Sequence, residues 1–149
     1  MTVKKKGRWR PLLAADIAKG IREGNFRLED LRFPLWVSPK YDGIRGLHAG
    51  HEMQSRKLKR IPARHLQERY DGGEDQVLWG IEGELIFGDP LAPDVMQMTT
   101  SAVMSEDKDD LAKRVNWYVF DYFLYADGVE VPPYRERLAE LKRVVKRLK

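Results

Sequence analysis

The sequence contains no cysteine. It therefore has no disulfide and no thiolate metal site, which fits a reducing compartment such as the cytoplasm. No apolar run approaches the roughly 20 residues that span a membrane. The first ten residues, MTVKKKGRWR, carry the charge of a signal peptide without the apolar stretch that follows in one. We therefore expect a cytoplasmic protein with no membrane span.

Two common ligand-binding signatures are also absent. The sequence has no GxxxxGK[ST] loop, so any nucleotide must be bound in another way. The three histidines, His48, His51 and His65, have no metal-ligand spacing with nearby carboxylates. We interpret them as ordinary loop or helix residues.

What the sequence does contain is charge, and it is unevenly distributed. Of the 149 residues 34% are charged and 42% are hydrophobic, which suits one domain with a buried core. The net charge is +10 over residues 1–70, −10 over residues 71–110 and +4 over residues 111–149. The basic first part favours a polyanion such as nucleic acid or a nucleotide phosphate. A solvated surface balanced by an acidic loop region explains the same pattern.

Apolar periodicity and turn residues predict short strands and helices in alternation. The expected strands cover residues 35–38, 44–48, 53–56, 81–87 and 115–121, the last of them buried. Helices or helical turns are expected from Pro11 to Gly24, at 28–31 and 62–69, and after Pro132-Pro133. Residues 99–104 are expected to form a short helix or to be irregular. Asp127-Gly128 is typical of a hairpin turn. The interleaving predicts an α+β (mixed α/β) domain with mainly antiparallel sheets and flanking helices, preceded by a basic flexible arm at residues 1–10.

The string KYDGIR at residues 40–45 is the most informative one. A lysine amine can attack a nucleotide phosphate and hold the nucleotide covalently. Lysine is normally protonated at neutral pH, with a pKa near 10.4, so Lys40 needs burial or a nearby cation such as Arg45. Arg45 and Arg56 could also hold phosphate oxygens. Asp42 could orient the lysine, and Gly43 permits a tight turn. The alternative is a surface hairpin, in which these are ordinary turn residues.

Two carboxylates lie close together in the predicted strand at residues 81–87. Glu82 and Glu84 are two apart and so face one side of a strand, where they repel unless a cation or a donor lies between them. A divalent metal or a ribose hydroxyl would suit one of them, and a bend at Gly83 would separate them. An exposed face is the alternative. Phe120 is expected in the core, although an aromatic at a strand end can also stack on a base.

The basic run KLKR at residues 57–60 follows Ser55-Arg56. Such a run is usually a solvated surface. The functional alternative is a contact with phosphate or nucleic acid.

Taken in order, these segments resemble the motifs of the covalent nucleotidyltransferases, most closely the ATP-dependent DNA ligases of phages. The segments that carry the resemblance are Ser38–Arg45, Ser55-Arg56 with Ile61-Pro62, Glu82–Leu85, Thr99–Ser101, Tyr118–Asp121 and Tyr134–Arg137. The resemblance implies an ATP-grasp-like adenylation domain that uses ATP and Mg²⁺ on nicked double-stranded DNA in a bacterial or phage-infected cell.

The same resemblance implies roles for individual residues. Lys40 would attack the α-phosphate of ATP and carry AMP, with Asp42 and Gly43 in support. Glu84 would serve the ribose or the metal, and Phe120 would stack on adenine. The nucleotide-binding set implied by the resemblance is Ser38, Pro39, Lys40, Arg45, Arg56, Glu84 and Phe120.

The chain departs from the family pattern in two places. Ser38 stands where many DNA ligases have a glutamate, and the later motifs and the oligonucleotide-binding-fold domain are absent from the sequence up to Lys149. We therefore expect residues 11–149 to form a partial adenylation domain, which a second chain could complete. The alternatives are an RNA ligase, an mRNA-capping type of guanylyltransferase, or a non-catalytic nucleic-acid-binding remnant.

Overall fold

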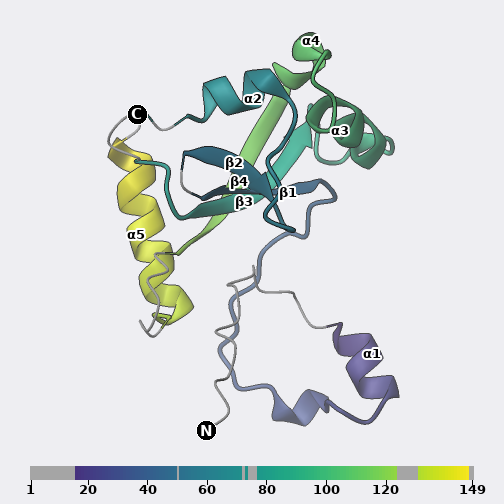
Figure 1. Ribbon diagram of the computed structural model, residues 1–149. Helices are drawn as coiled ribbons and strands as arrows, with labels where there is room; N and C mark the ends of the chain where they lie inside the picture. The colour runs from purple at the N-terminus through teal and green to yellow at the C-terminus, as the bar shows by residue number, and fades with distance from the viewer. Residues whose placement is uncertain (1–15, 50, 72, 74–76, 124–130, 148–149) are drawn as a thin grey trace, which may run out of the picture. The chain divides into compact units, whose positions relative to one another are not determined.

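The computed structural model describes residues 16–49, 51–71, 73, 77–123 and 131–147 (Figure 1). The chain divides into two compact units, Met1–Lys40 and Tyr41–Lys149, which are described separately. The expected basic arm at residues 1–10 and the expected hairpin turn at Asp127-Gly128 lie outside the described residues.

The first unit contains helix α1 (Ile17–Arg22) and a short 3₁₀ helix, η1 (Leu28–Asp30). The Asp16 side chain caps α1 by accepting a hydrogen bond from a backbone N–H of the first turn. Gly24 follows the end of α1 and has φ of 70°, the left-handed conformation that a glycine often adopts after a helix. Both predicted helical segments are thus confirmed where they fall on described residues.

The strand predicted at residues 35–38 is wrong, because this segment is irregular. A strand exists only when another strand pairs with it, and no described residue forms a ladder with residues 35–38. Pro34 and Pro39 also remove the backbone donor on either side of the segment. Trp36 and Val37 are exposed by 71% and 89%. The β-branched and aromatic composition was therefore a misleading signal here.

A four-stranded antiparallel sheet forms the centre of the second unit, in the order β2-β1-β3-β4 (Figure 1). Its strands are β1 (Ile44–Ala49), β2 (Glu52–Ser55), β3 (Ile81–Phe87) and β4 (Val115–Tyr122). The α+β class, the antiparallel sheet and these four strand positions confirm the predictions. β4 is less buried than expected, because it lies at an edge of the sheet, and only its first residue is fully covered.

Among the described residues four helices accompany this sheet: α2 (Arg64–Arg69), α3 (Val95–Val103), α4 (Asp109–Ala112) and α5 (Tyr134–Arg147). The helix expected near residues 99–104 begins four residues earlier than predicted. The expected helix after Pro132-Pro133 is confirmed as α5. None of the described helices is long and apolar enough to cross a membrane.

Two apolar clusters join the helices to one face of the sheet. Leu85 and Phe87 of β3 pack with residues of α2 and α3, whereas Ile81 packs with Leu141 and Val144 of α5. The apolar stripe of α5 therefore packs on the sheet of its own chain. Because side chains of a strand alternate between faces, the intervening residues of β3 project from the opposite face.

Candidate functional site

The face of the sheet opposite the two apolar clusters carries the predicted polar residues. Antiparallel pairing places Glu84 of β3 directly between Arg45 of β1 and Tyr118 of β4. Glu82 is likewise opposite Asp121 of β4. Three strands thus bring together side chains that lie as many as 76 positions apart in the sequence.

Arg45 lies between the two carboxylates of β3. Its Nε donates a hydrogen bond to Oε1 of Glu82, and its backbone pairs with Glu84. Glu82 is only 3% exposed. Burial raises the pKa of the Glu82 carboxyl, and the hydrogen bond and charge of Arg45 oppose that rise. The cation that two carboxylates on one face require is therefore Arg45, and the interpretation of Glu82 as an exposed residue is wrong.

Phe120 lies on the same face because β4 contains a bulge. The register runs from Gly83↔Val119 to Glu82↔Asp121, so Phe120 is the extra residue. Its ring centroid lies 5.5 Å from Cζ of Arg45, a distance at which a guanidinium and an aromatic face attract. Phe120 is half-buried and belongs to neither apolar cluster. The expectation that it is a core residue is therefore wrong.

The first turn of α5 is fastened to the end of β4. Arg137 donates from Nε and Nη2 to the two carboxylate oxygens of Asp121, at 2.9 and 3.0 Å. The hydroxyl of Tyr134 donates to the carbonyl oxygen of Phe120 at 3.1 Å. This ion pair is not predicted from the sequence, although Asp121 directly follows Phe120 and Arg137 lies in the segment Tyr134–Arg137, which resembles a ligase motif.

The start of β1 approaches β3 very closely at Gly43. A Cβ atom at this position would collide with the carbonyl oxygen of Leu85 and come within 2.9 Å of Cγ of Glu84. Gly43 is therefore required by a close approach of backbones rather than by a hairpin turn, and the hairpin interpretation is wrong. Tyr41 packs on Tyr118, with ring centroids 5.1 Å apart. The segment from Gly43 to Arg45 thus runs alongside Glu84 and Leu85 of β3.

The remaining predicted residues fall in both units. Ser38, Pro39 and Lys40 are exposed and end the first unit, and Tyr41, which is bonded to Lys40, begins the second. Asp42 is exposed. Arg56 is exposed and directly follows Ser55, the last residue of β2. Ser55 pairs with Gly46, the residue after Arg45 in β1. The second unit therefore brings Arg45, Glu84 and Phe120 together, with Arg56 at the same end of the sheet.

The chain is similar to known structures but not to any family model or curated protein. Two crystal structures of the Chlorella virus DNA ligase-adenylate are similar to it. One is 29% identical with a TM-score of 0.55 over 81% of this chain and 40% of the viral chain. The other is 30% identical with a TM-score of 0.55 over 80% of this chain and 39% of the viral chain.

The chain has a DNA ligase adenylation-type fold. It spans about 40% of the viral ligase chains that it matches. The predicted nucleotidyltransferase type of fold is therefore confirmed. The roles of single residues remain predictions.

Carboxylates of the described residues bear on metal binding. Among the described residues no three histidine or acidic side chains gather in a way that could hold a metal ion. Glu84 is half-buried and hence accessible on the polar face. Mg²⁺ is commonly held by one or two carboxylates together with substrate phosphates. The residues present fit a magnesium ion of that kind.

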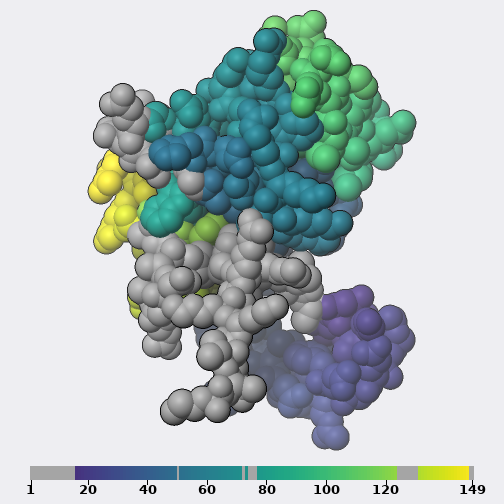
Figure 2. Space-filling model, in the orientation of Figure 1, coloured from purple at the N-terminus to yellow at the C-terminus, as the bar shows by residue number. Residues whose placement is uncertain are grey.

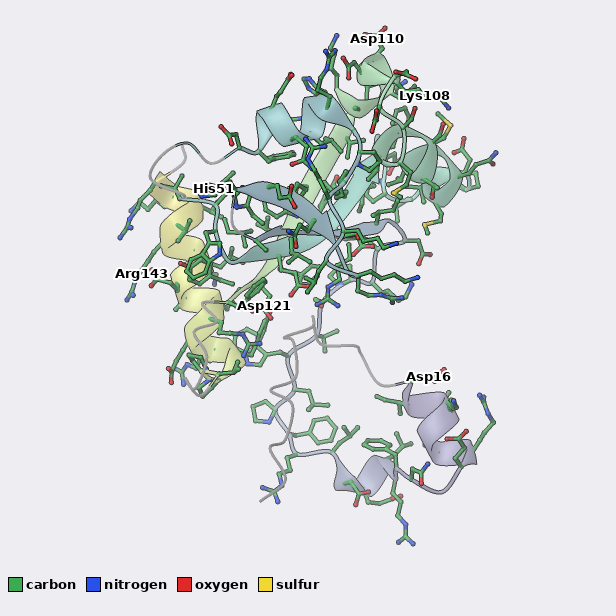
Figure 3. The ribbon with its side chains drawn as sticks, in the orientation of Figure 1. Asp16, His51, Lys108, Asp110, Asp121 and Arg143 are labelled. Carbon is green, nitrogen blue, oxygen red and sulfur yellow. The ribbon has the colours of Figure 1, made fainter. Side chains whose placement is uncertain are left out.

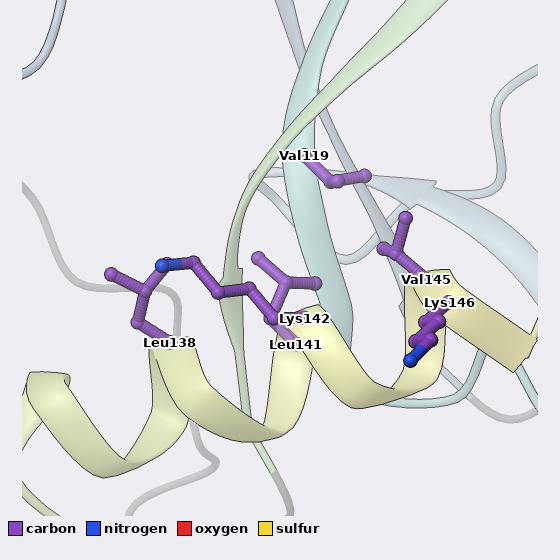
Figure 4. A pocket seen from close by; sticks show the side chains of 6 residues that line it. All are labelled: Val119, Leu138, Leu141, Lys142, Val145 and Lys146. Atoms are coloured by element: carbon purple, nitrogen blue, oxygen red, sulfur yellow. The ribbon is translucent and has the colours of Figure 1, made fainter.

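A separate groove lies between β4 and α5 of the ligase-type fold (Figure 4). It has a volume of about 350 Å³ and is mainly apolar. Its lining consists of Val119, Leu138, Leu141, Lys142, Val145 and Lys146. None of the predicted site residues is among them, so this groove is distinct from the polar face.

Proposed function

We propose that this chain is the adenylation module of an ATP-dependent DNA ligase. The observation that carries the proposal is the assembly of Arg45, Glu84 and Phe120 on one face of a ligase adenylation-type fold. The KYDGIR segment adds a candidate nucleophile, because only three residues separate Lys40 from β1, the strand that carries Arg45.

In the first step Lys40 acts as the nucleophile. Its neutral Nζ attacks the α-phosphorus of ATP, and the bond from that phosphorus to the bridging oxygen breaks. Pyrophosphate leaves and the amine releases a proton to solvent, which yields a lysyl-AMP phosphoramidate. Mg²⁺, when bound, offsets negative charge on the phosphate oxygens.

The polar face would bind and orient the nucleotide. Phe120 offers a half-buried ring for stacking on adenine, worth roughly 1–3 kcal/mol by analogy with base–aromatic contacts. Arg45 and Arg56 would contact phosphate oxygens, and Glu84 would hold the ribose or the magnesium ion. Glu82 would fix the orientation of Arg45 through their hydrogen bond.

In the later steps AMP passes to DNA. The 5′-phosphate at a nick attacks the α-phosphorus, and the Lys40 amine leaves and takes up a proton. The 3′-hydroxyl then attacks the activated 5′-phosphorus, AMP leaves, and the hydroxyl proton passes to solvent. Nicked double-stranded DNA is therefore the proposed substrate.

The test is self-adenylation with α-labelled ATP and Mg²⁺. We expect label that survives denaturation on the wild type and none on Lys40→Ala. Lys19→Ala, an exposed lysine of the same unit, is the matched control and should keep the label. Because the chain spans about 40% of the viral ligase, the assay is run with and without an added C-terminal portion of a DNA ligase. No label in either case would refute the proposal.

Two further arms separate the alternatives. Labelling from GTP in preference to ATP would assign a guanylyltransferase. Sealing of nicked RNA in preference to nicked DNA would assign an RNA ligase. Unlabelled protein that still binds nucleic acid would assign a non-catalytic role.

A further inference from the structure

The loop after β2 gathers four cationic side chains. Residues 56–60 read Arg-Lys-Leu-Lys-Arg, and all four basic residues are exposed, whereas Leu58 is half-buried. We call these five residues the basic loop. On the face shown in Figure 2, residues of the β2–α2 region form part of the teal surface of the second unit.

The basic loop is held in one conformation by its backbone. The N–H of Ser55 donates to the carbonyl oxygen of Lys59, and the N–H of Leu58 donates to the carbonyl oxygen of Ser55, both at 2.8 Å. Arg60 forms a β-bridge with Gln54, which closes the base of the loop. Leu58 has φ of 57°, a conformation that is costly for a residue with a branched side chain. The surrounding bonds offset that cost.

Gln67 of α2 anchors the base of the loop from beneath. Its Oε1 accepts from the N–H of Met53 at 2.9 Å, and its Nε2 donates to the carbonyl oxygens of Met53 and Ile61 at 2.8 and 2.7 Å. Met53 and Ile61 are fully buried. The loop therefore presents its charges from a rigid base, which lowers the entropy lost when a partner binds.

The charge of the basic loop is largely uncompensated. Arg60 forms an ion pair with Glu52, with 3.4 Å between Nε and Oε2. Within the part of the chain that the structure describes, Arg56, Lys57 and Lys59 have no ion pair. Neighbouring like charges repel, so a fixed cluster of this kind favours an anionic partner.

The position of the basic loop connects it to the candidate site. Ser55 pairs with Gly46, so Arg56 continues towards the end of the sheet where Arg45 and Glu84 lie. Arg56 is thus the residue of the basic loop nearest in the chain to β2 and to the candidate site, and Lys57 and Lys59 follow it. A partner that carries regularly repeated negative charges could contact the site and these lysines at once, as a nucleic-acid backbone does.

We propose that the basic loop binds the phosphate backbone of duplex DNA beside the nick, with Lys57 and Lys59 as sequence-independent contacts. This inference rests on the proposed function for the identity of the partner. A single phosphate group would neutralise fewer than three cations. A nucleic-acid backbone carries a phosphate at every nucleotide and could contact Arg56, Lys57 and Lys59 together. Contacts of this type position a duplex and do not read its sequence.

The test measures binding of a labelled nicked duplex by fluorescence anisotropy at several salt concentrations. Each lost phosphate contact makes the slope of log K against log salt shallower by about 0.9. We expect Lys57→Ala/Lys59→Ala to weaken binding and make the slope shallower by about 1.8. Lys57→Arg/Lys59→Arg should preserve it. Lys142→Ala/Lys146→Ala, which removes the same charge from exposed positions on α5, should leave the slope unchanged.

Self-adenylation of the same variants separates the two proposals. The lysine-to-alanine pair in the basic loop should be labelled as fully as the wild type, because neither lysine is assigned to the nucleotide. If the wild type takes no AMP label and the lysine-to-alanine pair still makes the salt slope shallower, the DNA-binding role of the basic loop is supported and the enzyme proposal is refuted. Three results would overturn the proposal that the basic loop binds DNA. They are no duplex binding by the wild type, equal salt slopes in all variants, or the same loss of binding in the α5 control. Tighter binding of an RNA duplex would overturn its assignment to DNA.

Discussion

Arg137 in α5 holds Asp121 at the end of β4 through two hydrogen bonds of 2.9 and 3.0 Å. The side chains are 12% and 17% exposed, so the pair is largely withdrawn from water. Asp121 in turn lies opposite Glu82, the partner of Arg45. Two arginines thus alternate with two carboxylates, and α5 is joined electrostatically to the polar face.

Removal of Arg137 should destabilise the second unit. Arg137→Ala leaves the half-buried Asp121 without this partner and beside the buried carboxylate of Glu82, and we expect a loss of about 2–3 kcal/mol in the free energy of unfolding. The control is Arg143→Ala, which breaks an exposed pair with Glu140 on the same helix and should cost less than about 0.5 kcal/mol. Figure 3 shows Asp121 and Arg143 on opposite sides of α5. Denaturant titration gives both values, and equal losses would contradict the role of the pair.

A methyl group at Gly43 should be far more disruptive than one at an unobstructed glycine. Gly43→Ala places Cβ against the carbonyl oxygen of Leu85, and the strands must separate to admit it. Gly73→Ala meets no atom within 4 Å, so only its φ of 66° imposes a cost, of about 1 kcal/mol. We expect Gly43→Ala to cost at least twice that amount in thermal or denaturant unfolding. A smaller loss than that of Gly73→Ala would show that the close approach is absent in solution.

The two carboxylates of β3 should differ in whether they contribute to stability as well as to self-adenylation. Glu82→Gln removes the buried charge that pairs with Arg45, so it should reduce stability by about 1–3 kcal/mol and also reduce self-adenylation. Glu84→Gln changes a half-buried residue and should reduce self-adenylation while leaving the unfolding midpoint nearly unchanged. Unfolding curves and labelling yields of the two variants check this. The reverse pattern would exchange the roles assigned to the two residues.

His48 should make stability fall in mild acid. It is fully buried, and burial lowers its pKa below the usual 6.5, opposed by the backbone of Asp71 and Tyr70. The unfolded chain therefore binds a proton more readily than the folded one below pH 6.5. The contribution of His48 is complete above pH 6.5 and declines as the pH falls from 6.5 through the lowered pKa. Unfolding free energies from pH 8 to pH 5 should show this decline, and His48→Phe should remove that part of it.

Local patterns in the sequence predicted most of the sheet. The alternation at residues 44–48 correctly identified a strand, because periodicity reports which face of a strand is buried. The apolar run at 115–121 also identified a strand, although not one buried on both faces. The segment at residues 35–38 has strand composition but no paired strand, which its own sequence could not show. Composition measures only suitability for a sheet.

The site was predicted in part. The spacing of Glu82 and Glu84 indicated the shared face and the need for a cation, and Arg45 was named on independent grounds. Sequence alone could not identify Arg45 as that cation, because the register between β1 and β3 sets the pairing. The bulge at Phe120 and the bond between Asp121 and Arg137 depend in the same way on contacts between separate elements.

The most direct test of the proposed function is to locate the adenylate by tandem mass spectrometry. The chain is incubated with ATP and Mg²⁺, with and without a C-terminal portion of a DNA ligase, and then digested. The account predicts one AMP on the peptide that contains Lys40, with the fragment ions assigning it to that residue. An AMP on another lysine, or none in either incubation, would contradict the account.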